Sequence, residues 1–179
     1  MLSRETNVGA LRRLAGRLER RGIVGEISLL DGTAMVLAFQ ARQSTKDVDA
    51  IFAPAGIIRE EARLVAQELD LPPDWLNDTA KGFASPEGDF GSLEDIDFPS
   101  LRVQAPTAEY MLAMKVMAAR VGLGGESADK EDIRFLIRRL RLITADQVFE
   151  LVRRYYDPSR ILPRSMYLIE EIFSEEERQ

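Results

Sequence analysis

The spacing of apolar residues changes character near residue 105, and this change limits the folds open to the chain more than any other feature. Before that point, runs with a period of two (46–52) alternate with runs at helical spacing (8–18). After it, only helical spacing remains. We therefore expect an α+β fold, with an α/β core over residues 1–105 and a helical C-terminal part over 106–179 that packs on the core.

Individual elements follow from the same periodicity and from the residues that limit each run. Helices are predicted where apolar residues recur every three or four positions, and strands where they alternate or form short runs. The predicted helices cover the first twenty residues, 33–40, 58–69, 106–121, 133–140, 144–155 and 165–173, and the strands cover 23–30, 46–52 and 101–103. Residues 74–99 are acidic and rich in glycine and proline, which predicts loops with short elements.

The chain contains neither cysteine nor histidine. Disulfides, thiolate zinc sites and the commonest general base are therefore excluded. Any catalysis would use carboxylates, lysine, hydroxyls or a hard cation with oxygen ligands. The first residues lack the apolar run of a signal peptide, and no stretch approaches the length of a membrane span, so we expect a cytoplasmic protein without a membrane partner.

Charge is distributed unevenly along the chain. The formal net charge of −6 argues against a protein that coats DNA through excess lysine and arginine. Residues 70–97 carry about −7 and residues 133–164 about +5, by counting side chains. The basic part is able to contact RNA, and the alternative is that its arginines simply lie on solvated helix faces.

Two acids separated by one residue lie in the predicted strand 46–52. Because side chains alternate along a strand, Asp47 and Asp49 project from the same face and can share one Mg²⁺ or Mn²⁺ ion. Upstream, Gly32 permits close backbone approach, the start of the next helix offers free N–H groups to a triphosphate, and Thr33 adds a hydroxyl. Taken singly, the acid pair is typical of a polar strand face and the Gly-Thr pair of a turn.

Together these residues resemble a known family. The pattern Gly-Thr-Ala at 32–34, Arg-x-Ser-Thr at 42–45 and Asp-x-Asp at 47–49 resembles the nucleotidyltransferase superfamily, in particular the AbiEii-like toxins of bacterial toxin-antitoxin systems. The segment 74–78 is similar to a related branch of uncharacterised members. The resemblance spans residues 8–140 and rests mainly on residues 31–49.

This resemblance implies a nucleotidyltransferase-type mixed sheet flanked by helices. It also implies a metal-dependent enzyme that moves a nucleoside monophosphate from a nucleoside triphosphate (NTP) to a hydroxyl acceptor, with the 3′ end of a transfer RNA as one acceptor and a cognate antitoxin as a protein partner. The metal would be held by Asp47 and Asp49. The NTP would be bound by Gly32, Thr33, Arg42, Ser44 and Lys115.

The family also uses a lysine on a later helix and an acid further on. Lys115 matches the lysine and Asp132 matches the acid, which makes both candidate catalytic residues together with the metal ligands. Lys115 has apolar neighbours, so its ammonium either reaches a phosphate or extends to solvent. Asp129 can replace Asp132 by a small register shift, and Asp97 is a candidate third metal carboxylate.

Two rival functions fit the same sequence. One is a nucleotidyltransferase-fold module that has lost turnover and binds or regulates a partner protein. The other is an enzyme that modifies a small molecule or a protein, since the acidic stretch 70–97 suits a cationic acceptor. Trp75 within that stretch is expected to be a core anchor rather than a platform for base stacking.

Overall fold

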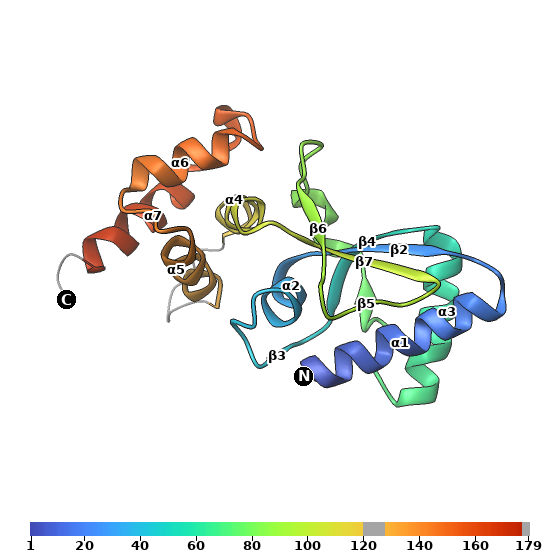
Figure 1. Cartoon of the computed structure of the whole chain (residues 1–179). Helices are drawn as coiled ribbons and strands as arrows, with labels where there is room; N and C mark the ends of the chain where they lie inside the picture. Colours follow the sequence, from blue (N-terminus) through green and yellow to red (C-terminus); the bar gives the residue numbers. More distant parts are fainter. Residues whose placement is uncertain (120–127, 177–179) are drawn as a thin grey trace. The chain divides into compact units, whose positions relative to one another are not determined.

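The computed structural model describes residues 1–119 and 128–176. Within them the chain is α+β, with a mixed five-stranded sheet, a two-stranded antiparallel sheet and seven α-helices (Figure 1). The chain divides into two compact units. We call Met1–Gly82 with Phe90–Pro106 the sheet unit, and Phe83–Asp89 with Thr107–Gln179 the helical unit. No helix in these described ranges is long and apolar enough to cross a membrane.

The main sheet has the strand order β5-β4-β2-β7-β6. The central strand β2 is antiparallel to β4 and parallel to β7, while β5 joins β4 in parallel and β6 joins β7 antiparallel. A separate antiparallel pair joins β1 and β3. In chain order the elements are β1 Leu2–Ser3, α1 Arg4–Arg20, β2 Gly25–Leu29, α2 Asp31–Leu37, β3 Ser44–Thr45, β4 Val48–Ala53, α3 Ala55–Leu69, β5 Leu76–Asn77, the 3₁₀ helix η1 Thr79–Phe83, β6 Phe90–Ser92 and β7 Leu101–Pro106.

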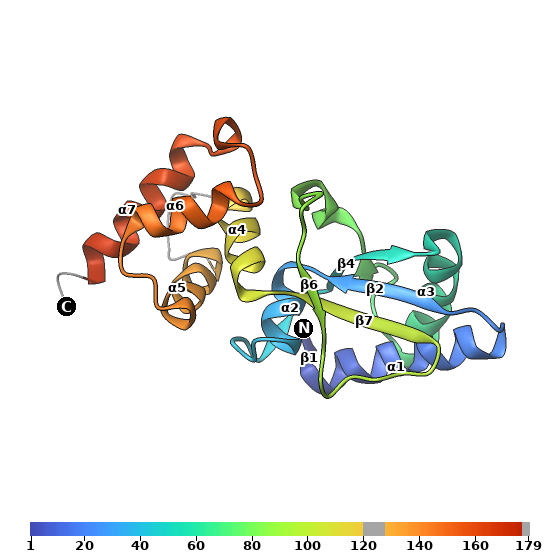
Figure 2. The same ribbon diagram turned by 45° about the horizontal axis from the view of Figure 1, so that its top comes forward.

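Helices α1 and α3 cover one face of the main sheet (Figures 1 and 2). Residues that face these helices alternate with residues on the other face, as the period of a strand requires. The buried set comprises Ile27, Leu29, Val48, Ala50, Phe52, Leu101 and Val103. The opposite face carries half-exposed or exposed side chains, including Glu26, Ser28, Asp49, Ile51, Arg102 and Gln104. We call this second surface the open face of the sheet.

Close packing between the helices and the sheet requires a glycine at the start of β2. A Cβ atom at Gly25 would lie 2.9 Å from Leu18 Cδ1 on α1 and 3.2 Å from Ile58 Cδ1 on α3. A larger residue would therefore force the Leu18 and Ile58 side chains to shift in a close-packed core.

A network of ion pairs links α1 to α3. The carboxylate of Glu61 on α3 accepts hydrogen bonds from Arg17 Nε and Arg21 Nη1, each at 2.6 Å, and Arg17 also pairs with Glu68. Burial alone would raise the pKa of Glu61, but the hydrogen bonds from Arg21 and Arg17 outweigh it and hold the pKa below its ordinary value. Ionised Glu61 therefore stabilises the folded state.

We expect Glu61→Gln to lower the free energy of unfolding by about 1–3 kcal/mol at pH 7, because a buried, hydrogen-bonded charge is lost. Since the folded-state pKa of Glu61 is depressed, this contribution is complete above the ordinary pKa of a glutamate and disappears as the pH falls through the folded value. Thermal melting of both proteins should thus differ most near neutrality and converge in acid. The exposed neighbour Glu60, which also pairs with Arg21, provides the control Glu60→Gln, and an equal effect at both positions would contradict the expectation.

The helical unit contains α4 Ala108–Ala118, α5 Ala128–Leu140, α6 Ala145–Arg153, the 3₁₀ helix η2 Pro158–Arg160 and α7 Pro163–Glu176. Threonines begin two of its helices. The Thr107 side chain accepts a hydrogen bond from the Tyr110 N–H at α4, and the Thr144 side chain accepts one from the Gln147 N–H at α6. Such caps satisfy N–H groups that have no partner within the helix.

The short segment Phe83–Asp89 belongs to the helical unit, although it lies within the residues predicted as core, 1–105. Hydrogen bonds to tyrosines of that unit explain this placement. The Ser85 N–H donates to Tyr110 Oη at 2.7 Å, and the Tyr156 hydroxyl donates to the Phe83 carbonyl at 2.5 Å. Ser85 Oγ also donates to the carbonyl of Tyr155 at 2.5 Å.

Most predicted elements are confirmed, with shifted ends. Helix α2 begins at Asp31, two residues before the predicted start, and β4 begins at Val48, so that Asp47 precedes the strand. The short elements expected within 74–99 are β5, η1 and β6. The predicted end of the helix over 106–121 lies outside the described residues. Trp75 is confirmed as a core anchor, because it is fully buried and its Nε1 donates to the Ala62 carbonyl at 2.9 Å.

Candidate functional site

Asp47 directly precedes β4 and Asp49 is the second residue of that strand, on the open face of the sheet. Val48 and Ala50 point into the core, so the two acids on either side of Val48 project in the opposite direction. Both acids are half-exposed. The i, i+2 spacing thus brings two carboxylates to one accessible edge of the open face.

The end of β5 and the start of η1 contact both carboxylates. In the parallel pairing of β4 and β5, Asp49 is the partner of Asn77. Asn77 Nδ2 donates to Asp47 Oδ2 at 3.1 Å, and Thr79 Oγ1 donates to Asp49 Oδ1 at 2.9 Å. The site therefore combines two carboxylates, whose oxygens suit Mg²⁺ or Mn²⁺, with an amide N–H and a hydroxyl that hydrogen-bond to them.

Gly32 and Thr33 pack α2 against the segment that leads into β4. Thr33 is fully buried, and its hydroxyl donates to the backbone carbonyl of Asp47 at 2.9 Å. A Cβ atom at Gly32 would lie 2.7 Å from Thr45 Oγ1, which explains the glycine there. Both residues thus help to place Asp47, and their contact with a triphosphate stays a prediction.

This arrangement distinguishes two roles for Thr33. If its hydroxyl serves the Asp47 carbonyl, Thr33→Val should lower the free energy of unfolding by about 1–2 kcal/mol, because a buried carbonyl loses its donor. Thr33→Ser, which keeps the hydroxyl, should lose less. Urea unfolding measures both effects. A Thr33→Val protein that unfolds like the wild type but binds NTP more weakly would instead support direct phosphate contact.

The other residues predicted to bind NTP lie between α2 and β4. Ser44 is in β3, opposite Ser3, and is half-exposed. Arg42 Nη1 lies 3.5 Å from the position of a Cβ atom at Gly32, so the guanidinium is close to the start of α2. Contact of either residue with phosphate stays a prediction.

The candidate third carboxylate, Asp97, is exposed in the loop before β7, between the buried Ile96 and Phe98. Strand β7 itself presents Arg102 and Gln104 on the open face, rather than an acid. In the sheet unit, the acid pair of β4 is therefore not extended by a carboxylate from β7.

In the helical unit, Lys115 lies between two carboxylates of α5. Its Nζ is 2.8 Å from Asp132 Oδ2 and 3.0 Å from Asp129 Oδ1. The side chains of Lys115 and Asp132 are each only 3% exposed, whereas Asp129 is 28% exposed. The alternative that Lys115 extends to solvent is therefore wrong, and its contact with a phosphate stays a prediction.

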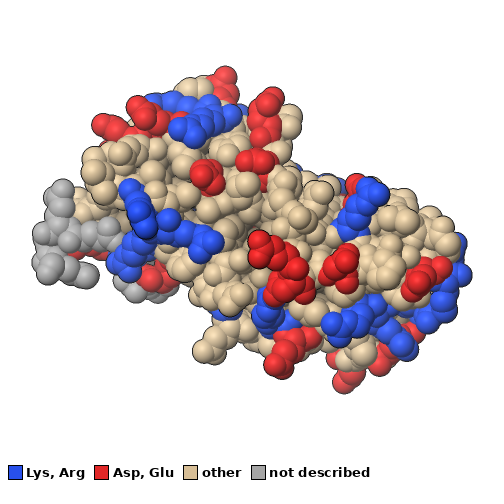
Figure 3. Space-filling model, viewed as in Figure 1, with Lys and Arg blue, Asp and Glu red and all other residues tan. Residues whose placement is uncertain are grey.

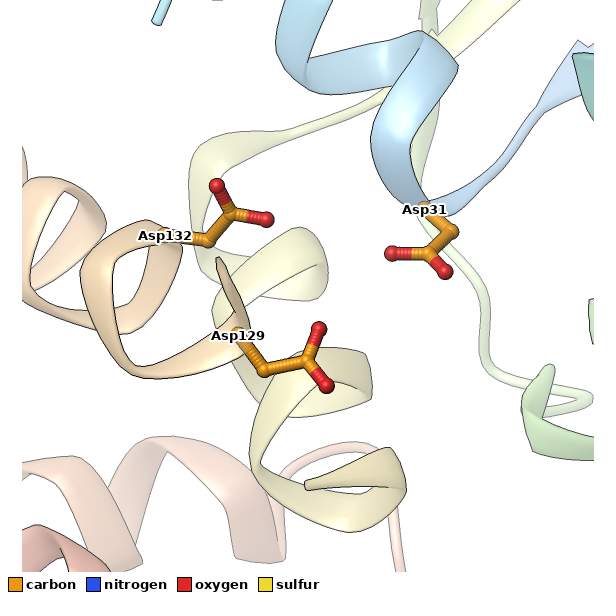
Figure 4. Close-up of side chains that lie close together, drawn as sticks. All are labelled: Asp31, Asp129 and Asp132. Atoms are coloured by element: carbon orange, nitrogen blue, oxygen red, sulfur yellow. The ribbon is translucent and has the colours of Figure 1, made fainter. Parts of the chain in front are cut away.

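Three further carboxylates are candidate cation ligands, Asp31 in the sheet unit and Asp129 and Asp132 in the helical unit. Asp31, Asp129 and Asp132 each offer one carboxylate oxygen as a ligand. Figure 4 shows Asp129 and Asp132 projecting from α5, and Asp31 at the first turn of α2. Asp31 adopts φ of 43°, a left-handed conformation that is uncommon for a residue other than glycine.

No protein-family model, curated protein or solved structure matches this chain. The resemblance to nucleotidyltransferases thus stays a prediction drawn from residues 31–49. Support for a function must come from the side chains that the fold brings together.

Asn77 and Thr79 are site residues that sequence reasoning missed. Asn77 ends a strand of two residues, which is too short to show a period in the sequence, and Thr79 begins η1. The one available signal was the segment 74–78, which resembles a related branch of the family and contains Asn77.

Proposed function

We propose that this chain is a metal-dependent nucleotidyltransferase that moves a nucleoside monophosphate from an NTP to a hydroxyl acceptor. One observation carries the proposal: Asp47 and Asp49 lie side by side on the open face of a mixed sheet, each with a neutral hydrogen-bond donor. Neutral donors orient the two carboxylates without adding a positive charge of their own.

The proposed roles follow from this geometry. Asp47 and Asp49 hold Mg²⁺ or Mn²⁺, which when bound neutralises charge on the reacting phosphate and on the leaving pyrophosphate. Thr33 and Gly32 fix the backbone at Asp47, and Arg42, near the start of α2, contributes positive charge toward the phosphates. Lys115 and Asp132 retain a proposed catalytic role through the family resemblance alone.

A transfer RNA is the acceptor that the resemblance favours, in which case the protein acts as the toxin of a toxin-antitoxin pair. The arginine-rich helices of the helical unit suit this acceptor, since Arg141, Arg153 and Arg154 are exposed. Figure 3 shows a group of basic side chains over α5, whereas acidic and basic side chains are interspersed over the sheet unit. Part of the basic charge is internal to the fold, because Arg134 pairs with Glu131 and Glu175.

A binding module without turnover is the second candidate, and a specific observation favours it. Two groups assigned to the triphosphate already have partners within the protein: the Thr33 hydroxyl with the Asp47 carbonyl, and the Lys115 ammonium with Asp129 and Asp132. Such a module would bind its partner protein without consuming NTP.

The deciding experiment incubates the purified protein, Mg²⁺ and each α-labelled NTP with cell extract, then separates RNA, protein and small molecules. Label in the RNA fraction supports the tRNA acceptor, and label in another fraction reassigns the acceptor. No label in any fraction, combined with no rise in melting temperature when Mg²⁺ and NTP are added, would exclude the enzyme and favour the binding module.

A further inference from the structure

Residues 77–79, where β5 ends and η1 begins, have features that the proposed metal site does not by itself require. Asn77, Asp78 and Thr79 are consecutive, yet they face two directions. Asn77 and Thr79 hydrogen-bond the acid pair, whereas Asp78 contacts cationic side chains of α3 and η1. From this geometry we infer that residues 77–79 form a positioning clamp, which holds Asp47 and Asp49 in the orientation that binds the cation. The inference rests on the proposed metal site.

The orientation of the Asn77 amide is fixed by the turn itself. Its Oδ1 accepts the backbone N–H of Thr79 at 3.0 Å, so its Nδ2 must be the group that faces Asp47. The Thr79 hydroxyl has one hydrogen and two acceptors within reach, Asp49 Oδ1 at 2.9 Å and Asn77 Oδ1 at 2.5 Å. Asn77 Oδ1 has two lone pairs and can accept both donors of Thr79, so Asn77 Oδ1 and Asp49 Oδ1 share the single hydroxyl hydrogen.

Asp78 anchors the clamp to the rest of the sheet unit. Its Oδ2 accepts hydrogen bonds from Lys81 Nζ at 2.6 Å and Arg59 Nη2 at 2.8 Å. These two cations hold the pKa of Asp78 below its ordinary value, the hydrogen bond from Lys81 contributing most. Arg59 also lies over the ring of Phe52 on β4, with Cζ 5.3 Å from the ring centre. The turn is thus tied to α3 and β4 as well as to the acids.

Uncharged donors suit a clamp on metal ligands. An arginine or lysine at position 77 or 79 would orient the carboxylates but would also cancel the charge that attracts a cation. An amide and a hydroxyl restrict rotation of the carboxylates and add no positive charge. Groups that support metal ligands in this way typically change metal affinity 10–100-fold when they are removed.

The test measures Mn²⁺ binding to the full chain, through the loss of the free Mn²⁺ signal in electron paramagnetic resonance, together with thermal melting without metal. We expect Asn77→Ala to weaken Mn²⁺ binding about 10–100-fold, and Thr79→Val to fall near the lower end of that range because Thr79 is exposed. Thr79→Ser keeps the hydroxyl and should therefore bind Mn²⁺ about as tightly as the wild type. The control Ser92→Ala removes a hydroxyl from β6, at the opposite edge of the sheet, and should bind Mn²⁺ like the wild type.

Three outcomes distinguish failure of the clamp from failure of the proposed metal site. Weaker binding in both variants, with metal-free melting close to the wild type and rescue by Thr79→Ser, supports the clamp. Wild-type affinity in Asn77→Ala and Thr79→Val, combined with lost affinity in Asp49→Asn, overturns the clamp but leaves the metal site intact. A wild-type protein that binds no Mn²⁺ overturns the proposed metal site, and the clamp with it.

Discussion

Asp49→Asn is expected to reduce nucleotide transfer by on the order of 100-fold or more. Residues that merely support a metal ligand contribute 10–100-fold, so a direct ligand should contribute at least as much. Folding should change little, within about 0.5 kcal/mol, because asparagine keeps an oxygen that can accept the Thr79 hydrogen bond and relieves repulsion from Asp47. Transfer assays and thermal melting, each with and without Mg²⁺, provide the paired measurement.

A matched control for this substitution is Glu26→Gln, which neutralises an exposed acid on the open face of β2. Glu26 pairs with Arg102 at 2.8 Å, so it is an ordinary surface ion pair. Its transfer activity should remain near that of the wild type. Near-full activity in Asp49→Asn, or an equal loss in both variants, would remove the basis for an enzyme built on the acid pair.

Lys115→Met is expected to lower the free energy of unfolding by about 3–5 kcal/mol, because it leaves the buried carboxylate of Asp132 without its cation. This expectation differs from that of a lysine that only contacts phosphate, whose loss would spare folding. The double variant Lys115→Met/Asp132→Leu removes both buried charges and should recover much of the loss. Urea unfolding of the two variants beside the wild type measures the effect.

Arg102→Met serves as the control for Lys115→Met, since it breaks an exposed ion pair that contributes about 1 kcal/mol or less. If Lys115→Met unfolds like the wild type but binds NTP more weakly, the ammonium must leave Asp129 and Asp132 when nucleotide binds. That result would support direct contact between Lys115 and the triphosphate.

The secondary structure could be predicted where local signals agree. Helix α6 has an amphipathic run with a threonine cap at Thr144, and α1 and α3 have apolar stripes that pack on the sheet. Strand β4 shows the alternation of a half-buried strand, which also identified Asp47 and Asp49 as neighbours on one face. For these elements the pattern that is visible in the sequence is the same pattern that the core requires.

The remainder depends on contacts between distant residues and left no local signal. The Asn77–Asp47 bond joins residues 30 positions apart, and it depends on the parallel pairing of β5 with β4. The sequence suggested Asp132 as an acid that orients either Lys115 or the acceptor, and the ion pair with Lys115 depends on the packing of α5 against α4. Conversely, the sequence neighbours of Thr33 suggested that its hydroxyl contacts phosphate. In the structure this hydroxyl donates a hydrogen bond to the backbone carbonyl of Asp47.

The membership of Phe83–Asp89 in the helical unit affects how the protein must assemble during synthesis. These seven residues leave the ribosome before β7, yet their partners Tyr110 and Tyr156 follow later in the chain. Strand β7 can pair with β2 as soon as it has been synthesised. At that stage the segment Phe83–Asp89 does not yet have its hydrogen-bond partners Tyr110 and Tyr156. A separately expressed fragment that begins at Thr107 would likewise leave the Tyr110 and Tyr156 hydroxyls without the backbone groups they bond. The helical unit is thus finished last, from two pieces of chain that are synthesised at different times.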